Sequence, residues 1–239
     1  MNNPWDALSP LFNTTKDEEE ISSHVADNIL IAWPVILDFI EQNKPTGENL
    51  RLLEYGCGSG SFAYKLQKLD YNVTGIDSSE GMIKNAKAAY GDEIKFLVGD
   101  SSILSKQSLY SIITSVMTFQ FVENIEKTFQ DLFDVLEPGG IFIFAIHNPE
   151  LVKKYIHLGI FFEDFDSDEN PKRGILHLRD NKIPIFIRSA NEYNHILQKI
   201  GFESLLEEYP PFTEEYIKKY PTSEPVDVAE YLILGYKKV

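Results

Sequence analysis

A glycine-rich segment with the pattern E-Y-G-C-G-S-G at positions 54–60 is the part of the chain best suited to chemistry. Glycines at alternate positions let backbone NH groups approach a ligand closely, because no Cβ stands in the way. The dinucleotide pattern G-x-G-x-x-G is not matched, since Ser61 stands where the third glycine would fall. Glu54 beside the loop suits a cation better than a pyrophosphate, so the pattern argues against a nicotinamide dinucleotide.

Two further carboxylates follow short apolar runs. Asp77 ends the run 73–76, where its side chain can accept hydrogen bonds from both hydroxyls of a ribose. Asp100 ends the run 94–98, where an adenine amino group could donate to it; the alternative is that Asp100 only caps the helix that follows. With Glu54, these residues predict a ligand site at the carboxyl ends of the strands, for a cationic adenosine compound without phosphates.

The elements that must position these residues alternate between two periodicities. Short apolar runs lie at 52–55, 73–76, 94–98, 111–116 and 141–146, with candidate helices at 61–69, 79–90 and 123–136 between them. This alternation predicts a doubly wound α/β fold, in which helices cover both faces of a parallel sheet. A further helix from Ser189 to Ile200, closed by Gly201, and two strands near 202–208 and 229–236, separated by a Pro-rich loop, complete the pattern.

Two regions lie outside this alternation of strands and helices. Residues 17–43 have apolar side chains at helical spacing, with acidic residues 17–20 on the first turn and a break or kink at Pro34. We therefore expect an N-terminal helical cap over 1–47, followed by the main domain over 48–239. Residues 148–188 read as an irregular insertion that forms a lid. Its aromatic residues predict either an acceptor pocket or the lid's own core, and they are Tyr155, Phe161, Phe162 and Phe165.

Composition narrows the function classes. The 239 residues are 43% hydrophobic and 25% charged, as in a soluble globular protein, and 37 acidic against 22 basic residues give a net charge of −15, which disfavours a nucleic-acid partner. Cys57 is the sole cysteine, so we expect no disulfide and no metal site, and a reducing cytoplasm. No export signal and no membrane-spanning segment is evident.

Taken together, the motifs resemble those of the class I S-adenosylmethionine-dependent methyltransferases. The resemblance covers about residues 48–147 and rests on the glycine run with Glu54, on Asp77, on Gly99-Asp100 and on L-E-P-G-G at 136–140. It implies a Rossmann-like, seven-stranded, mostly parallel sheet of order 3-2-1-4-5-7-6 with the last strand antiparallel. The stretch 183–239 more weakly resembles bacterial small-molecule methyltransferases.

The resemblance also implies a cofactor site for S-adenosyl-L-methionine, with S-adenosyl-L-homocysteine as product. The glycines would face the methionine part, Asp77 the ribose, and Asp100 with Ser101 the adenine. The expected cofactor-binding residues are Glu54, Gly56, Cys57, Gly58, Gly60, Asp77, Ser78, Met82, Asp100, Ser101, Ser102, Met117 and Phe119. For Met117 and Phe119, which follow the fourth strand, core packing is the alternative.

The function that follows is transfer of a methyl group to an oxygen or nitrogen nucleophile of a small molecule by in-line displacement, without a metal. His147 ends the fifth strand and is either a general base or a loop histidine that bonds its own turn. A protein or RNA methyltransferase and a non-catalytic cofactor-binding module are the alternatives. We expect a monomer or a homodimer.

Overall fold

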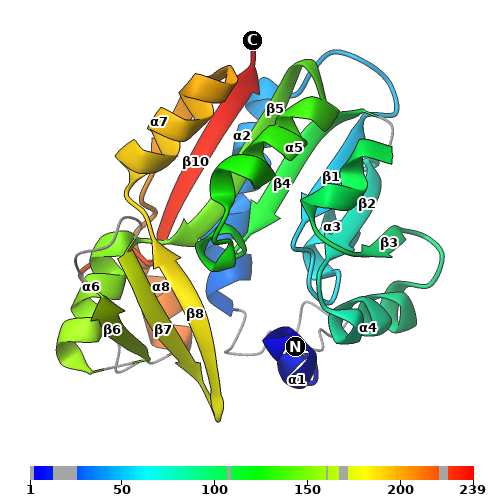
Figure 1. Ribbon diagram of the computed structural model, residues 1–239. Coiled ribbons are helices and arrows are strands. Elements are labelled where there is room, and N and C mark those ends of the chain that lie inside the picture. The colour runs from blue at the N-terminus through cyan, green and yellow to red at the C-terminus, as the bar shows by residue number, and fades with distance from the viewer. Residues whose placement is uncertain (1–2, 13–25, 107–108, 160, 167–171, 221–225) are drawn as a thin grey trace.

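A large mixed sheet forms the centre of the computed structural model, which describes residues 3–12, 26–106, 109–159, 161–166, 172–220 and 226–239. Its strands run in the order β3-β2-β1-β4-β5-β10-β9 (Figure 1). β10 is antiparallel to both of its neighbours, and the other pairs are parallel. The bounds are β1 Arg51–Tyr55, β2 Asn72–Asp77, β3 Lys95–Val98, β4 Tyr110–Val116, β5 Leu136–His147, β9 Phe202–Glu208 and β10 Tyr231–Lys238.

The large sheet confirms the α/β, Rossmann-like, mostly parallel fold. Its last two strands are β9 and β10 rather than the sixth and seventh of the chain, because the insertion after β5 contributes three strands that we did not predict. Counted within the large sheet alone, the two final strands take the sixth and seventh places, with the last strand lying next to β5.

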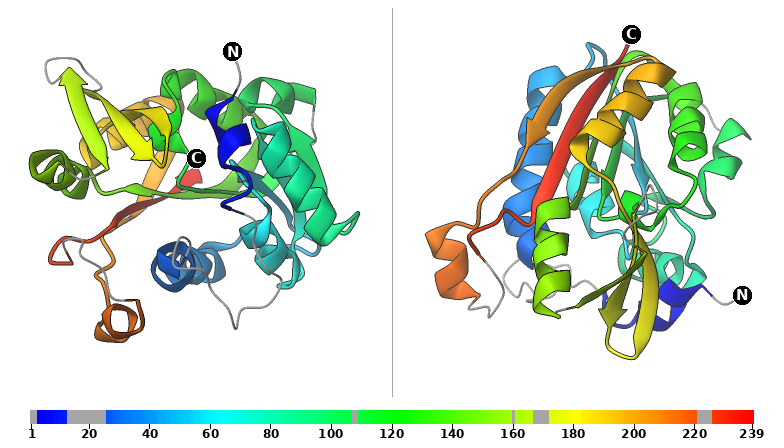
Figure 2. Two further views of the ribbon diagram at one scale, coloured as in Figure 1. Left: turned by 90° about the horizontal axis from the view of Figure 1, so that it is seen from below. Right: turned by 60° about the vertical axis from the view of Figure 1, so that its left-hand side comes forward.

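Helices cover both faces of this sheet (Figure 2). On one face, Ile36 of α2, Phe62 of α3 and Ile83 of α4 belong to one buried apolar cluster with sheet residues. On the other face, Phe129 of α5 and Tyr193 of α7 belong to a second cluster. The helices are α2 Trp33–Asn43, α3 Ser61–Gln67, α4 Glu80–Tyr90, α5 Ile125–Val135 and α7 Ala190–Ile200. Burial of strands on both faces explains their near-continuous apolar runs.

The described N-terminal part has an irregular helix around Pro34, as expected from the predicted break or kink. A π-helical turn, η1 Asn28–Ala32, continues directly into α2, whose second residue is Pro34; the missing NH of the proline interrupts the helical bonding at this point. The expected acidic first turn at 17–20 lies outside the described residues. A short helix that we did not predict, α1 Pro4–Leu8, begins after Asn3, whose side chain accepts a hydrogen bond from the Trp5 NH. The division at residue 47 stays a prediction.

The described residues of the insertion form regular elements, so the expectation of an irregular segment was wrong, while its role as a lid stays a prediction. It contains α6 Pro149–Leu158 and a three-stranded antiparallel sheet of β6 Phe162–Asp166, β7 Lys172–Leu178 and β8 Asn181–Ile187. The sequence concealed these strands because Gly174 and Pro184, residues depleted in strands, interrupt β7 and β8. The expected loop before β10 likewise contains α8 Glu214–Lys219. Figure 1 shows α1, α6 and the small sheet beyond the end of the large sheet where β4 and β5 finish.

Candidate functional site

One cavity of about 1290 Å³ lies at the carboxyl ends of the parallel strands. Its walls come from the glycine loop, from the residues after β2, β3, β4 and β5, and from α1, η1, the small sheet and α8. Open α/β sheets bind ligands at this edge, because the connections after neighbouring strands diverge there and leave a crevice. The cavity therefore joins the predicted ligand site to the insertion.

The three glycines of the loop have different roles. Gly56 has φ of +76°, and a Cβ on it would lie 2.0 Å from the Thr118 Oγ1, so close packing requires this glycine. Gly58 has φ of +53°, and a Cβ on it would have no atom within 4 Å, so its α-carbon faces open space. A Cβ on Gly60 would lie 2.7 Å from the Phe96 ring. Gly60 is not among the residues that line the cavity, and it lets the start of α3 pack on the sheet; its assignment as a cofactor contact stays a prediction.

Asp77 holds the glycine loop and the start of α4 together. Its Oδ2 accepts a hydrogen bond from the Gly58 NH at 2.9 Å, and its Oδ1 accepts one from the Ser79 NH at 2.9 Å. Burial raises the pKa of this carboxyl group, while the two backbone donors oppose that rise. Asp77 lines the cavity, so one side chain both shapes the loop and offers a carboxylate to a ligand.

Glu54 places a second carboxyl group under the loop. The residue is 2% exposed, and its Oε2 has no hydrogen-bond partner among the described residues. Burial raises its pKa well above the ordinary value, and the nearby Asp77 carboxylate adds to that rise. A buried oxygen without a partner at a cavity wall is suited to a cationic or hydrogen-bond-donating ligand group.

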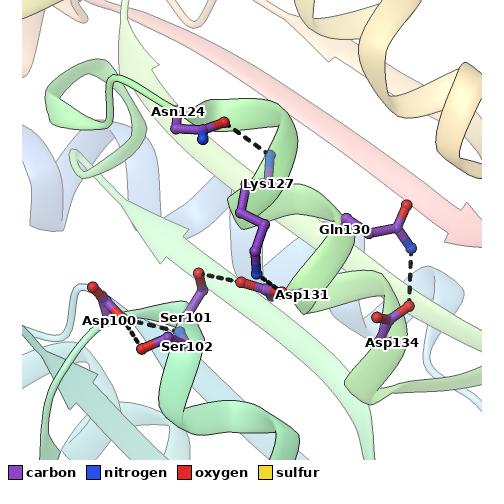
Figure 3. A network of polar contacts seen from close by, with 8 residues as sticks. All are labelled: Asp100, Ser101, Ser102, Asn124, Lys127, Gln130, Asp131 and Asp134. Atoms are coloured by element: carbon purple, nitrogen blue, oxygen red, sulfur yellow. Dashed lines mark hydrogen bonds and ion pairs between the residues drawn. The ribbon is translucent and has the colours of Figure 1, made fainter.

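The cavity end near β3 contains a polar network (Figure 3). Asp100 Oδ1 accepts hydrogen bonds from the NH and the Oγ of Ser102, at 2.9 and 2.6 Å, and these bonds lower the pKa of Asp100. The capping role is therefore present in a residue that also lines the cavity. Ser101 Oγ donates to Asp131 Oδ2 at 2.7 Å, and Lys127 pairs with the same carboxylate. Lys127 and Asp131 were not predicted, since the residues of α5 form no motif.

The two predicted cofactor contacts after β4 differ in position: Met117 lines the cavity, and Phe119 lies in the core. Met117 lines the cavity, and its φ is +56°. This is a strained backbone conformation for a residue other than glycine, and such conformations recur at functional sites. Phe119 is fully buried in the core and is not among the residues that line the cavity, which favours the core-packing alternative; its assignment as a cofactor contact stays a prediction. Its ring stacks on Tyr55 at 5.5 Å and meets the edges of Phe129 and Phe144 at 5.0 Å.

His147 ends β5 and lines the cavity, as the sequence predicted. Its Nδ1 is buried without a hydrogen-bond partner among the described residues, and its ring meets the Phe162 ring edge-on at 5.6 Å. Burial lowers the pKa of His147 to about 4, so the imidazole is neutral at pH 7. The alternative, in which the ring bonds its own turn, has no support in these contacts; Asn148 caps α6 instead.

Three further predicted residues line the cavity next to α4 and the loop: Cys57, Ser78 and Met82. Ser78 Oγ accepts a hydrogen bond from Asn3 Nδ2 at 3.0 Å, which ties α1 to the site. Cys57 belongs to the buried core, and burial raises the pKa of its thiol well above the ordinary value, as expected for a loop spacer rather than a nucleophile. The contribution of α1 was missed, because its sequence has no periodicity.

Comparisons with known proteins all point to methyltransferases. The model of the methyltransferase domain family matches residues 25–207. A malonyl-[acyl-carrier protein] O-methyltransferase of Ilyobacter polytropus is 29% identical over 89% of this chain and 88% of its own length. A ubiquinone biosynthesis O-methyltransferase of Rickettsia canadensis is 30% identical over 55% of this chain and 58% of its own.

A solved structure shares the fold. An S-adenosylmethionine-dependent methyltransferase from Mesorhizobium loti superposes with a TM-score of 0.64 at 21% identity, over 86% of this chain and 97% of that one. No helix within the described residues has the length and apolar character needed to span a membrane. The chain belongs to the methyltransferase domain family, which confirms the resemblance to the class I S-adenosylmethionine-dependent methyltransferases.

Proposed function

We propose that this protein transfers a methyl group from S-adenosylmethionine to an oxygen or nitrogen nucleophile of a small molecule. The observation that supports this most directly is that one cavity joins the glycine loop, Asp77 and Asp100 to a neutral histidine and to the apolar wall of the insertion. The two curated relatives are named as O-methyltransferases, which favours an oxygen acceptor. The net charge of −15 argues against a nucleic acid as acceptor.

The residues of the cavity suit the methyl donor chemically. Gly58 leaves open space that a Cβ would fill, and Glu54 offers a cationic group a buried oxygen that has no hydrogen-bond partner in the described part of the chain. Asp77 and Asp100 lie at the ends of β2 and β3, where they would hold the ribose and the adenine. When bound, S-adenosylmethionine supplies an electrophilic sulfonium methyl group with a good leaving group.

The chain's own residues would orient the acceptor, exclude water and receive a proton. Phe162, Leu176 and Ile183 belong to the apolar core of the insertion and also line the cavity, which supports an apolar acceptor pocket built on that core. The side chain of Phe165 lies outside the described residues. His147 Nδ1, neutral and unpaired, would accept the proton of an acceptor hydroxyl or amine.

Calorimetric titration with S-adenosylmethionine and S-adenosylhomocysteine, followed by an acceptor screen that measures S-adenosylhomocysteine release, tests this function. We expect binding of both compounds, lost in Asp77→Ala and weakened in Asp100→Asn. Asp100→Asn keeps the size and shape of the side chain, and Asp100 is not part of the glycine loop. Absence of binding in the wild-type protein, or binding without turnover for every acceptor class, would refute the proposal.

A separate experiment tests whether His147 accepts the proton of the methyl acceptor. His147→Gln should lower kcat at all pH values and leave the affinity for S-adenosylhomocysteine unchanged, because the ring is assigned to the acceptor rather than to the donor. An unchanged kcat over the full pH profile would remove His147 as the base.

A further inference from the structure

The short helix α1 lies at the donor end of the cavity, which is the end formed by the glycine loop and Asp77. Asn3 and the first two helical residues, Pro4 and Trp5, line the cavity there. The methyltransferase domain model matches residues 25–207, so α1 precedes the matched part of the chain. No step of the proposed function uses this helix, yet its hydrogen bonds lead to the residue expected to hold the ribose.

Asp6 of α1 caps the beginning of another helix, α4. Its Oδ1 accepts hydrogen bonds from the Ser79 Oγ at 2.6 Å and from the Gly81 NH at 3.0 Å. The first NH groups of a helix have no partner within that helix, and the helix dipole favours a negative charge beside them. The same two bonds lower the pKa of Asp6, so the group is a carboxylate at pH 7.

Ser79 connects this carboxylate to Asp77. The Ser79 NH donates to Asp77 Oδ1 at 2.9 Å. Its Oγ donates to Asp6 and accepts a hydrogen bond from the Met82 NH at 3.1 Å. Ser79 is fully buried, and its backbone and side chain are both fixed by these bonds. Asp6 therefore holds the residue that orients one oxygen of the Asp77 carboxylate.

Further contacts hold α1 on both sides of the cavity. Asn3 Nδ2 donates to Ser78 Oγ at 3.0 Å, on the side of α4. Leu8 is 1% exposed and belongs to the apolar cluster of the insertion. The Trp5 ring meets the Phe121 ring edge-on at 4.8 Å. Figure 1 shows α1 beside the start of α4, between the large sheet's ligand-binding edge and the small sheet.

Gly81 shows how closely α1 packs on α4. A Cβ on Gly81 would lie 2.7 Å from the Ser9 Oγ, 3.1 Å from the Ser9 Cβ and 3.4 Å from the Asp6 Cα. The φ of Gly81 lies outside the left-handed region, so an alanine there causes no backbone strain and suits a helix better than glycine. Only the closeness of α1 and the residue after it therefore disfavours a side chain at position 81.

We propose that α1 is part of the donor site and that Asp6 is a positioning residue, which holds Ser79 so that Asp77 faces the ribose of S-adenosylmethionine. This proposal rests on the proposed methyltransferase function and deepens it. Asp6 is not among the residues that line the cavity, so it acts through Ser79 rather than on the ligand. Residues before the matched family range then help to determine donor affinity.

Calorimetry with S-adenosylhomocysteine and its 2′,3′-dideoxy analogue tests this role, because the analogue lacks both hydroxyls that Asp77 would bind. The wild-type protein should prefer S-adenosylhomocysteine about tenfold or more. Asp6→Ala should remove most of this preference and leave the affinity for the analogue unchanged. Asp6→Asn keeps an oxygen that can accept from Ser79 and should retain most of the preference. Glu80→Gln is the matched control, because Glu80 is an exposed carboxylate in the same first turn of α4, and it should change neither affinity.

A second set of variants displaces α1 while Asp6 stays in place. Gly81→Ala should reduce the preference as Asp6→Ala does, and adding Ser9→Gly should restore it, because the two closest atoms are then absent. Circular dichroism confirms that each variant is folded.

Two results would overturn the proposal: equal losses for both ligands in Asp6→Ala, which indicate a merely structural role, or a preference that neither Asp6→Ala nor Gly81→Ala alters. A wild-type protein that binds both ligands equally would overturn it as well, while the proposed function would stand. If the wild-type protein binds no S-adenosylhomocysteine, the proposed function itself fails.

Discussion

Alanine substitutions at Gly56 and Gly58 should separate stability from ligand binding, although the two glycines lie one residue apart. Both have positive φ, at +76° and +53°, so each alanine costs about 1–2 kcal/mol for the left-handed conformation. The Cβ of Gly56→Ala would also lie 2.0, 2.5 and 2.7 Å from three atoms of the Thr118 side chain. The Cβ of Gly58→Ala would have no neighbour within 4 Å.

The contacts set the expected magnitudes. Overpacking against Thr118 adds about 1–3 kcal/mol to the strain, so Gly56→Ala should lose about 2–5 kcal/mol in total. Gly58→Ala should lose only the 1–2 kcal/mol of strain, or about 2–8 °C in Tm for a chain of this size. Its Cβ enters the open space beside the loop, however, so its affinity for S-adenosylhomocysteine should fall about tenfold or more.

Chemical denaturation gives the two stabilities, and calorimetry gives the two affinities. A double-mutant cycle with Thr118→Gly isolates the collision: Gly56→Ala and Thr118→Gly together should recover about 1–3 kcal/mol relative to the sum of the single losses. Equal stability losses for the two alanines, or wild-type ligand affinity in Gly58→Ala, would show that the loop does not have the geometry described above.

Three further outcomes follow from buried side chains. His147 stays neutral in the folded protein until the pH falls to about 4, but the unfolded side chain binds a proton below about 6.5, so its own contribution to stability should be complete above pH 6.5 and fall by about 3 kcal/mol between pH 6.5 and 4. The raised pKa of Glu54 acts in the opposite direction, so the His147 contribution is measured as the difference between the denaturation curves of the wild type and of His147→Gln. The buried Cys57 thiol should resist a disulfide reagent in the native protein and react fully in denaturant, and rapid native labelling would contradict its burial. Phe119→Ala should cost about 3–5 kcal/mol in denaturation, while Phe119→Leu should keep its affinity for S-adenosylhomocysteine; a selective loss of affinity would restore Phe119 as a wall residue.

The alternating strands and helices were readable along the chain because their signals are local. The helix 190–200 shows this well: Ser189 caps its start with a full capping box, and Gly201 follows its end, as the residue types predict. The carboxylates at 77 and 100 reached the cavity for the same reason, since each ends a parallel strand and parallel strands end at one edge.

The strands of the insertion escaped prediction because their stabilisation comes from pairing and packing. Gly174 and Pro184 weaken any local strand signal, yet β7 and β8 pair in continuous register and bury Ile183 and Ile185 against α6. The helix α8 is short, and short helices depend on tertiary contacts; Tyr216 of α8 is buried in the core cluster that contains α2.

The sequence by itself determined the fold class, the order of the ligand-binding motifs and most of the residues at the donor end, because hydrophobic period and glycine spacing are properties of neighbouring residues. Only the tertiary structure decided which side of each residue faces the cavity. Gly60 and Phe119 face the core, whereas Asp27 and Glu230, 203 positions apart, both line the one cavity. Such an arrangement depends on how α2 packs on β10, and no local pattern records that distance.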